Sequence, residues 1–252
     1  MKKTSQIFLI ILLVCTSTLR AEETLPPPFE ASFKIFKKGA EIAEMHRSLS
    51  RLDNGEFVYL SETNSTGLAS IFYKLHILEK SHWHLQDQQL KPLNYSYDRI
   101  KKKKESHKNT VFDWKNNQAN YIGNGKESSF ALNAGMTDKL LYQINIMHDF
   151  KNGHRPTTYT VVDGAKIKTY NFDYLGEEFI ETPIGGFDTV KLARRKPGEK
   201  GNTVLWCARD LHYLPIKVES TDDDGSVTTA MISQLKGLIE PENNNLSSDY
   251  SE

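Results

Sequence analysis

The segment FEASFKIFK, residues 29–37, decides how this chain can fold. Four apolar residues occur at every second position: Phe29, Ala31, Phe33 and Ile35. Successive side chains of a β-strand point to opposite faces, so this spacing places all four on one face and the polar residues between them on the other. The segment is therefore predicted to be a β-strand with one face buried and one face in water.

The same alternation recurs along most of the chain. An Asn-Gly dipeptide at 54–55, a strong signal for a tight hairpin turn, separates two alternating segments. Further on, Tyr95 and Tyr97 share one strand face, and Phe112 and Trp114 share another. Such segments follow one another roughly every ten residues with turn residues between them, which favours an antiparallel sheet, sandwich or open barrel over βαβ units.

One segment departs from this pattern: GMTDKLLYQINIMHDFKNG, residues 135–153. Its apolar residues recur at the spacing of one helix face, namely Leu140, Leu141, Ile144 and Met147. Thr137 or Asp138 can cap the start of a helix, and Gly153 stands where a left-handed residue commonly ends one. We therefore expect a helix over 137–150 that packs this apolar face against the concave side of the sheet.

The first 21 residues have the order of a secretory signal peptide. Two lysines precede the apolar run 7–14, which is too short to span a bilayer as a helix, and a short polar stretch ends at Ala21. We therefore expect cleavage after Ala21, a periplasmic location and no transmembrane span in the mature chain. The alternative is a lipoprotein anchored at Cys15, although Val14 stands at a position that favours Gly, Ala or Ser.

The remaining sequence divides into three parts. Residues 22–28 contain three consecutive prolines, which favour an extended linker. Residues 29–236 carry the alternating pattern and are expected to form a single β domain. Residues 237–252 form an acidic, asparagine-rich tail with little to bury, and we expect this tail to be disordered.

Charge and cysteine content exclude some classes of protein. Loss of residues 1–21 removes Lys2, Lys3 and Arg20 but no acidic residue, so the net charge changes from 0 to −3. That balance does not suit a nucleic-acid-binding protein. Cys207 is then the only cysteine in the sequence, so an intramolecular disulfide cannot form and stability must come from an ordinary core.

The segment LWCARDLHYLPIKVES, residues 205–220, brings Cys207, Asp210 and His212 close together in sequence, as in a nucleophilic site. Leu205 and Cys207 share a strand face, however, and residues 208–212 have the length of a tight connection to the next strand. We therefore interpret Cys207 as a small buried apolar residue. The sequence also lacks hydrolase, zinc-protease, ATP-binding and dinucleotide-binding motifs. This favours a protein without enzymatic activity or cofactor and leaves an enzyme of unrecognised type as a further alternative.

Two C-terminal motifs, ETPIGGFDTVKL (181–192) and LWCARDLHYLPIKVE (205–219), resemble the closing signature of a family of exported bacterial proteins. The family is catalogued as domain of unknown function 3108. FEASFKIFKKGAEIAEMHRSL, LKPLNYSYDR and TYNFDYLGEE also occur in the order of that family, so the resemblance covers most of residues 29–236. It implies an exported, mostly β domain and supplies no catalytic residues, and Cys207 stands where the family pattern does not require cysteine.

The Thr-Pro and Gly-Gly pairs of the first motif predict a turn at 182–186. Glycine supplies backbone angles that other residues avoid, and no helix start follows this turn. We therefore interpret the motif as a determinant of the fold and not as a phosphate-binding loop.

His76, His82 and His84 share a strand face if residues 74–85 form one strand. Histidines at i and i+2 can hold zinc or copper. Leu78 and Lys80 occupy the rest of that face, where no cysteine or carboxylate joins the histidines. We therefore expect no metal site.

The run RIKKKKESHK, residues 99–108, concentrates basic side chains at a hairpin. Lys101, Lys102, Lys103 and Lys104 can form a solvated tip that discourages pairing between sheet edges. The functional alternative is contact with an anionic surface, such as lipid head groups or phosphorylated glycans.

Together these patterns predict a mainly β protein: a strongly curved antiparallel sheet or incomplete barrel of about 10–12 strands, with one amphipathic helix on its concave side. We expect a non-enzymatic envelope protein that binds or carries an apolar or amphipathic ligand, such as a lipid or glycan, between helix and sheet. Its candidate ligand-binding residues, for which ordinary core is the alternative, are Phe33, Tyr95, Tyr97, Phe112, Trp114, Leu140 and Ile144. The alternative function is a structural adaptor that docks onto a protein partner in a cell-envelope assembly through a sheet edge or the basic hairpin tips.

Overall fold

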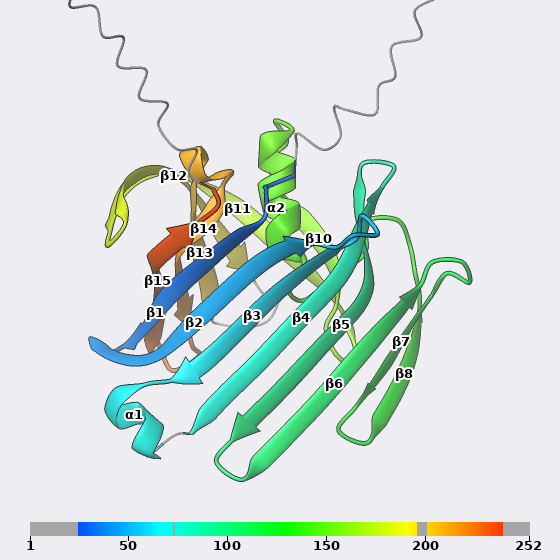
Figure 1. Ribbon diagram of the computed structural model, residues 1–252, viewed down its shortest axis with the longest axis horizontal. Coiled ribbons are helices and arrows are strands. Elements are labelled where there is room, and N and C mark those ends of the chain that lie inside the picture. Colours follow the sequence, from blue (N-terminus) through cyan, green and yellow to red (C-terminus); the bar gives the residue numbers. More distant parts are fainter. Residues whose placement is uncertain (1–24, 73, 196–200, 239–252) are drawn as a thin grey trace, which may run out of the picture.

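A computed structural model describes residues 25–72, 74–195 and 201–238. In these ranges fifteen strands form one sheet with the order β8-β7-β6-β5-β4-β3-β2-β1-β15-β14-β13-β12-β11-β10-β9 (Figure 1). Every pairing is antiparallel except the short parallel contact between β9 and β10. The expected mainly β fold with a curved, unclosed sheet is confirmed, and the sheet has more strands than expected.

The N-terminal part of the sheet contains β1 (Phe29–Lys37), β2 (Ala40–Arg51), β3 (Phe57–Ser65), β4 (Leu75–Gln86), β5 (Gln89–Lys101), β6 (Lys104–Asp113), β7 (Gln118–Gly123) and β8 (Lys126–Ala131). The C-terminal part contains β9 (Thr137–Asp138), β10 (Thr158–Val162), β11 (Ile167–Thr182), β12 (Gly185–Arg195), β13 (Asn202–Ala208), β14 (Leu214–Thr221) and β15 (Val227–Lys236). The helices are α1 (Gly67–Phe72) and α2 (Tyr142–Lys151), and a short 3₁₀ helix spans Arg209–Leu211.

The first strand lies near the middle of the sheet. As the alternation predicts, Phe29, Ala31 and Phe33 are buried on one face of β1. Phe33 is opposite Met45 of β2 on one side and Ile232 of β15 on the other. The first and last strands therefore meet, and the two halves of the sheet extend away from this junction in opposite directions.

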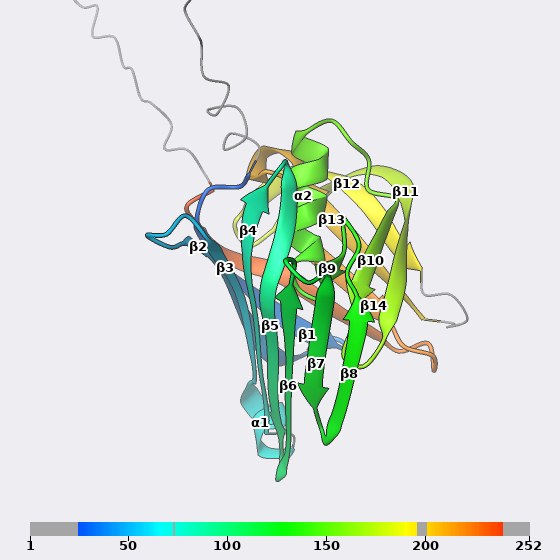
Figure 2. The same cartoon turned by 90° about the vertical axis from the view of Figure 1, so that its right-hand side faces the viewer.

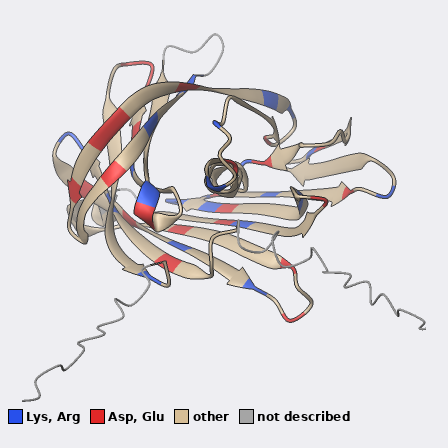
Figure 3. Ribbon diagram, turned by 90° about the horizontal axis from the view of Figure 1, so that it is seen from above, with Lys and Arg blue, Asp and Glu red and all other residues tan. Residues whose placement is uncertain are grey.

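Helix α2 lies inside the curve of the sheet. Figure 2 shows β4 and β5 on one side of α2 and β11 and β12 on the other, and Figure 3 shows the helix end-on within the curve. The predicted apolar face, Leu140, Leu141, Ile144 and Met147, is buried in the larger of two hydrophobic clusters. Tyr142 and Ile146 belong to the smaller cluster with residues of β10–β13. Because α2 contacts apolar residues on both sides, it is buried nearly all round.

The helix starts later than the sequence pattern predicts. Thr137 and Asp138 pair with Val161 and Val162 as β9, and α2 begins only at Tyr142. Asp138 does not cap α2 itself: its Oδ1 accepts hydrogen bonds from the backbone N–H groups of Leu140 and Leu141, in the turn that leads into the helix. The strand contact fixes the residues that were expected to form the first helical turn.

The Thr-Pro and Gly-Gly motif forms the β11–β12 hairpin, as predicted. The Thr182 hydroxyl donates a hydrogen bond to the Gly185 carbonyl oxygen at 2.7 Å. A Cβ atom on Gly186 would overlap the ring of Phe179, which lies across the strand. A larger residue at Gly186 would displace this exposed ring.

The first and last described residues, Leu25 and Leu238, are both buried leucines. Leu25, in the segment expected to be a linker, and Leu238, in the expected tail, belong to the larger cluster. The expected signal peptide and Cys15, with residues 22–24 and 239–252, lie outside the described residues. Within the described ranges, no helix is both long enough and apolar enough to cross a bilayer.

Candidate functional site

The sheet curls until its two halves face one another, but it does not close. In the described part of the chain, neither β9 nor β10 pairs with any of β4–β8. Where the two halves face one another, side chains of β4–β7 contact β9 and the β10–β11 loop. We call this contact the seam. Six side chains and the adjoining Thr110 and Gly164 line a small cavity there: Tyr95, Tyr97, Lys108, Tyr121, Lys139 and Asp163.

Two ammonium groups approach one aromatic ring at the seam. The Nζ atoms of Lys139 and Lys108 lie 5.1 Å and 5.0 Å from the centroid of the Tyr97 ring, within cation–π range. Lys139 Nζ is also 3.6 Å from Glu79 Oε1, and this carboxylate accepts a 2.5 Å hydrogen bond from the Tyr95 hydroxyl. The seam therefore combines aromatic surface with cationic groups.

The charges across the seam stabilise one another. Burial alone would raise the pKa of Asp163, but its hydrogen bond with Lys168 and the nearby charges of Lys139 and Lys108 outweigh this and hold the pKa below its usual value. Burial would likewise lower the pKa of Lys139, yet the charges of Glu79 and Asp163 raise it. Lys139 and Asp163 are consequently both charged at neutral pH.

A buried carboxylate joins the seam to the start of α2. Asp138 Oδ2 accepts a 2.5 Å hydrogen bond from the Ser81 hydroxyl of β4, while Oδ1 accepts the N–H groups of Leu140 and Leu141 at 2.8 and 2.7 Å. Burial raises the pKa of Asp138 to about 6, although the three hydrogen bonds act in the opposite direction. This side chain ties β4, β9 and the helix start together.

The seven predicted ligand-binding residues divide into two groups. Phe33, Phe112, Leu140 and Ile144 are buried in the larger cluster, while Trp114 packs against it and donates its Nε1–H to the Pro92 carbonyl oxygen at 2.7 Å. Tyr95 and Tyr97 reach the seam, where the cavity has a volume of about 10 Å³. That volume has room for about one water molecule, so the seam is closed to a lipid-sized ligand in this conformation.

Cys207 is fully buried, as predicted, in the smaller cluster with Leu205. Burial raises the pKa of its thiol, which stays protonated at neutral pH and is a poor nucleophile. The connection to the next strand is closed by a hydrogen bond from the Tyr213 N–H to the Ala208 carbonyl oxygen at 2.8 Å. The segment is a strand pair with a tight connection.

Two of the three histidines of β4, His76 and His82, lie beside acidic residues of the neighbouring β3 strand and of the turn before it. His76 Nε2 lies 3.0 Å from Glu62 Oε1, and His82 Nε2 lies 2.7 Å from Glu56 Oε2. In the described ranges, no group of three or more His, Cys, Asp or Glu residues has the arrangement of a metal site.

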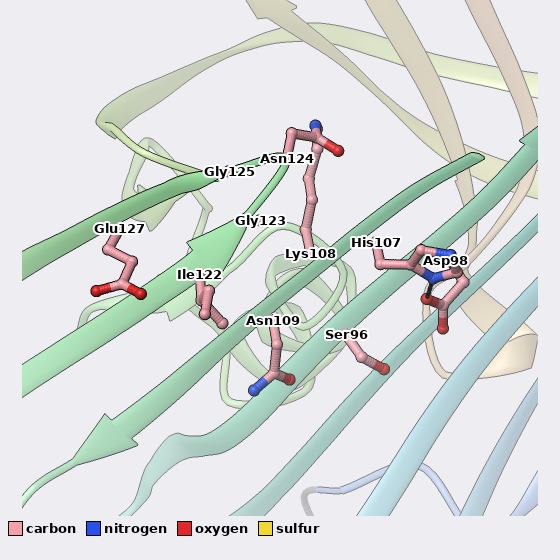
Figure 4. A pocket seen from close by; sticks show the side chains of 10 residues that line it. All are labelled: Ser96, Asp98, His107, Lys108, Asn109, Ile122, Gly123, Asn124, Gly125 and Glu127. Atoms are coloured by element: carbon pink, nitrogen blue, oxygen red, sulfur yellow. Dashed lines mark hydrogen bonds and ion pairs between the residues drawn. The ribbon is translucent and has the colours of Figure 1, made fainter. Parts of the chain in front are cut away.

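A polar hollow of about 740 Å³ lies over β5–β8 (Figure 4). Its polar side chains include Asp98 and His107, whose Oδ1 and Nδ1 atoms are 2.7 Å apart, with Glu105 at 3.6 Å from His107 Nε2. Hydrogen bonds to these two carboxylates raise the pKa of His107. Ser96, Asn109 and Ile122 line the same hollow on strand positions that alternate with the buried Tyr95, Thr110 and Tyr121, so it opens on the outer face of the sheet.

Several seam residues were not predicted from the sequence. Asp138 and Lys139 carried a usable signal, because two charged residues directly precede the buried Leu140 and Leu141. Lys108 and Asp163 carried none, since their roles depend on which distant strands face one another.

Several solved structures are similar to this chain at low sequence identity, and one of them shares its fold. A β-barrel-like protein of domain of unknown function DUF1849 from Brucella abortus is 8% identical, with a TM-score of 0.56; the match covers 86% of this chain and 99% of that one. A lipoprotein from Parabacteroides distasonis is 14% identical, with a TM-score of 0.34 and coverage of 84% and 98%. MucB is 11% identical, with a TM-score of 0.35 and coverage of 90% and 59%.

A comparison with curated proteins gave no match. The sequence profile of one family, by contrast, spans nearly the whole described fold. It covers every strand from β1 to β14, together with both helices and most of β15. The chain therefore belongs to the family described as Protein of unknown function (DUF3108), whose profile matches residues 28–232.

Proposed function

We propose that the protein is a non-enzymatic binding protein of the cell envelope that holds an anionic, amphipathic ligand between α2 and the sheet, with entry at the seam. The signal-peptide-like N-terminus supports the location. The observation that carries the proposal is the pair of lysines, Lys108 and Lys139, beside the Tyr97 ring at the one line where the described sheet halves meet without strand pairing. An apolar chain would contact the aromatic rings, and an acidic head group would contact the lysines.

The cavity in the closed seam is far smaller than the several hundred cubic ångströms typical of ligand sites, so binding requires the seam to open. Opening would break side-chain contacts such as Lys139–Glu79. It would break no backbone hydrogen bonds between paired strands, because no strand pairing crosses the seam in the described residues. Partly exposed ion pairs contribute only about 0–1 kcal/mol each, so the Lys139–Glu79 pair adds little to the cost of opening.

Native mass spectrometry of the protein purified from its own periplasm tests this proposal. We expect an adduct with the mass of an acidic amphiphile, reduced in the variant Lys108→Gln/Lys139→Gln. The matched control, Lys115→Gln/Lys151→Gln, removes two exposed lysines outside the seam and should keep the adduct. Absence of an adduct from the wild-type protein, or equal loss from both variants, would contradict the proposal.

The second candidate function is an adaptor, favoured by the outer edge of β8. This six-residue strand is the terminal strand of the sheet, so one of its backbone edges has no strand partner in the described chain. Such an edge can accept an extended segment of a partner protein. Photo-crosslinking residues placed at Glu127 and Ala131 should then capture a partner in the periplasm, whereas the same residue at the exposed loop position Asp53 should not.

A further inference from the structure

Helix α1 exposes two large apolar side chains at one end of the sheet. Leu68 and Ile71 are 77% and 70% exposed, although both are large aliphatic residues. They are three positions apart, so they lie on the same side of this short helix. The helix connects β3 to β4, and Leu68 and Ile71 contribute little to the core.

A basic hairpin lies beside α1. The Lys102 N–H donates a 2.8 Å hydrogen bond to the carbonyl oxygen of Lys74, two residues after the end of α1. Figure 1 shows α1 and the turn between β5 and β6 at the same end of the sheet. The apolar and basic features, far apart in sequence, therefore form one surface, which we call the α1 end.

The hairpin carries five basic side chains within six residues, Arg99 and Lys101–Lys104, and no acidic one. Its remaining residue, Ile100, is 39% exposed. The two-residue turn at Lys102 and Lys103 projects the lysines beyond the strands, while Glu105 follows at the start of β6. The α1 end thus combines cationic side chains with exposed apolar ones.

We propose that the α1 end docks the protein on an anionic lipid bilayer. Leu68 and Ile71 enter the interfacial region, and Lys101–Lys104 contact acidic head groups. Reversible membrane binding commonly needs both an apolar and an electrostatic contribution, because either alone is weak. A site for a free phosphate or a glycan would use the lysines but would give the two aliphatic side chains no partner, so the bilayer surface accounts for both features.

Vesicle flotation with the full mature chain tests the proposal. Wild-type protein should float with phosphatidylglycerol-containing vesicles and remain unbound with pure phosphatidylcholine vesicles. Leu68→Ser/Ile71→Ser and Lys103→Glu/Lys104→Glu should each lower binding by about tenfold or more, and added salt should weaken it. Circular dichroism verifies that each variant is folded.

Matched controls separate the α1 end from the rest of the surface. Val111→Thr/Ile122→Thr changes two other exposed aliphatic residues, and Lys115→Glu/Lys151→Glu makes the same charge change in the β6–β7 turn and at the end of α2. Both should bind anionic vesicles like wild type. Equal loss in the controls, or no preference of wild type for anionic vesicles, would overturn the proposal. Partner capture from envelope extracts that depends on Lys103 and Lys104 without vesicle binding would also overturn it, in favour of a protein surface.

Discussion

The two halves of the sheet meet twice, and the two contacts are built differently. At the β1–β15 junction, eight residue pairs continue the backbone ladder, and buried residues such as Phe33 and Ile232 lie side by side. At the seam, the halves meet through Ser81–Asp138 and Lys139–Glu79, without strand pairing in the described residues. The difference indicates that the junction holds the fold and that the seam is where it can open.

The largest expected effect is at the junction. Phe33→Ala should lower the free energy of unfolding by about 3–5 kcal/mol, because it leaves a cavity under a fully buried ring. Phe179→Ala removes the same side chain from a 58% exposed position and should cost about 1 kcal/mol at most. Urea denaturation measures both values. If the two variants lost equal stability, the junction would not be the stronger contact.

The next effect is a pH dependence at the seam. The pKa of Asp138 is about 6 in the folded protein and about 3.9 in an unfolded chain, so between these values the native state binds more protons. Stability from this group is therefore present at low pH and falls by about 3 kcal/mol as pH rises from about 4 to 6. Asp138→Asn keeps an acceptor for the Leu140 and Leu141 N–H groups but cannot ionise. Its stability relative to wild type should rise across that window.

Chemical denaturation of both proteins at several pH values measures this difference. Carboxylates with a lowered pKa, such as Asp163, act with the opposite sign but are common to both proteins and cancel. A stability difference that does not change with pH would show that Asp138 does not titrate in this range.

A smaller effect is expected from Ser81→Ala. This change removes the hydroxyl that donates to Asp138 Oδ2 and leaves a buried carboxylate oxygen without that partner, at a cost of about 1–3 kcal/mol. Because the same hydrogen bond lowers the pKa of Asp138, its loss should raise that pKa further. The cost should therefore be greater at pH 7 than at pH 5. Ser128→Ala, in a half-buried position of β8, provides the control, and a cost independent of pH would contradict the assignment.

The smallest stability change is expected from Lys139→Gln, about 1 kcal/mol or less, because Lys139 is partly exposed. Hydrogen exchange should be more sensitive than denaturation. In this variant the amides of β9 and β10 should exchange faster while those of β1 remain unchanged, since only the seam is weakened. Faster exchange in β1 as well would mean that the seam opens only with global unfolding.

The strands were predictable because the alternation of apolar and polar residues, as at Phe29, Ala31 and Phe33, can be seen within one short segment. The burial of Cys207 was predicted by the same alternation. The start of α2 was not predictable, because Asp138 pairs with Val162 of β10, a strand that comes later in the chain. The exposure of Leu68 and Ile71 on α1 could not be predicted, because helical spacing alone gives no information on what covers a helix. The seam could not be predicted either. It brings Lys108, Lys139 and Asp163 together across strands that do not pair, and the sequence does not say which distant strands face one another.

The position of β1 also bears on how the sheet assembles. One backbone edge of β1 pairs with β2, which follows at once, but the other requires β15, about two hundred residues later. As the chain emerges from its N-terminus, β1 therefore remains a half-paired strand until Val227–Lys236 arrive. The centre of the sheet therefore cannot close until the last strand of the domain has been made.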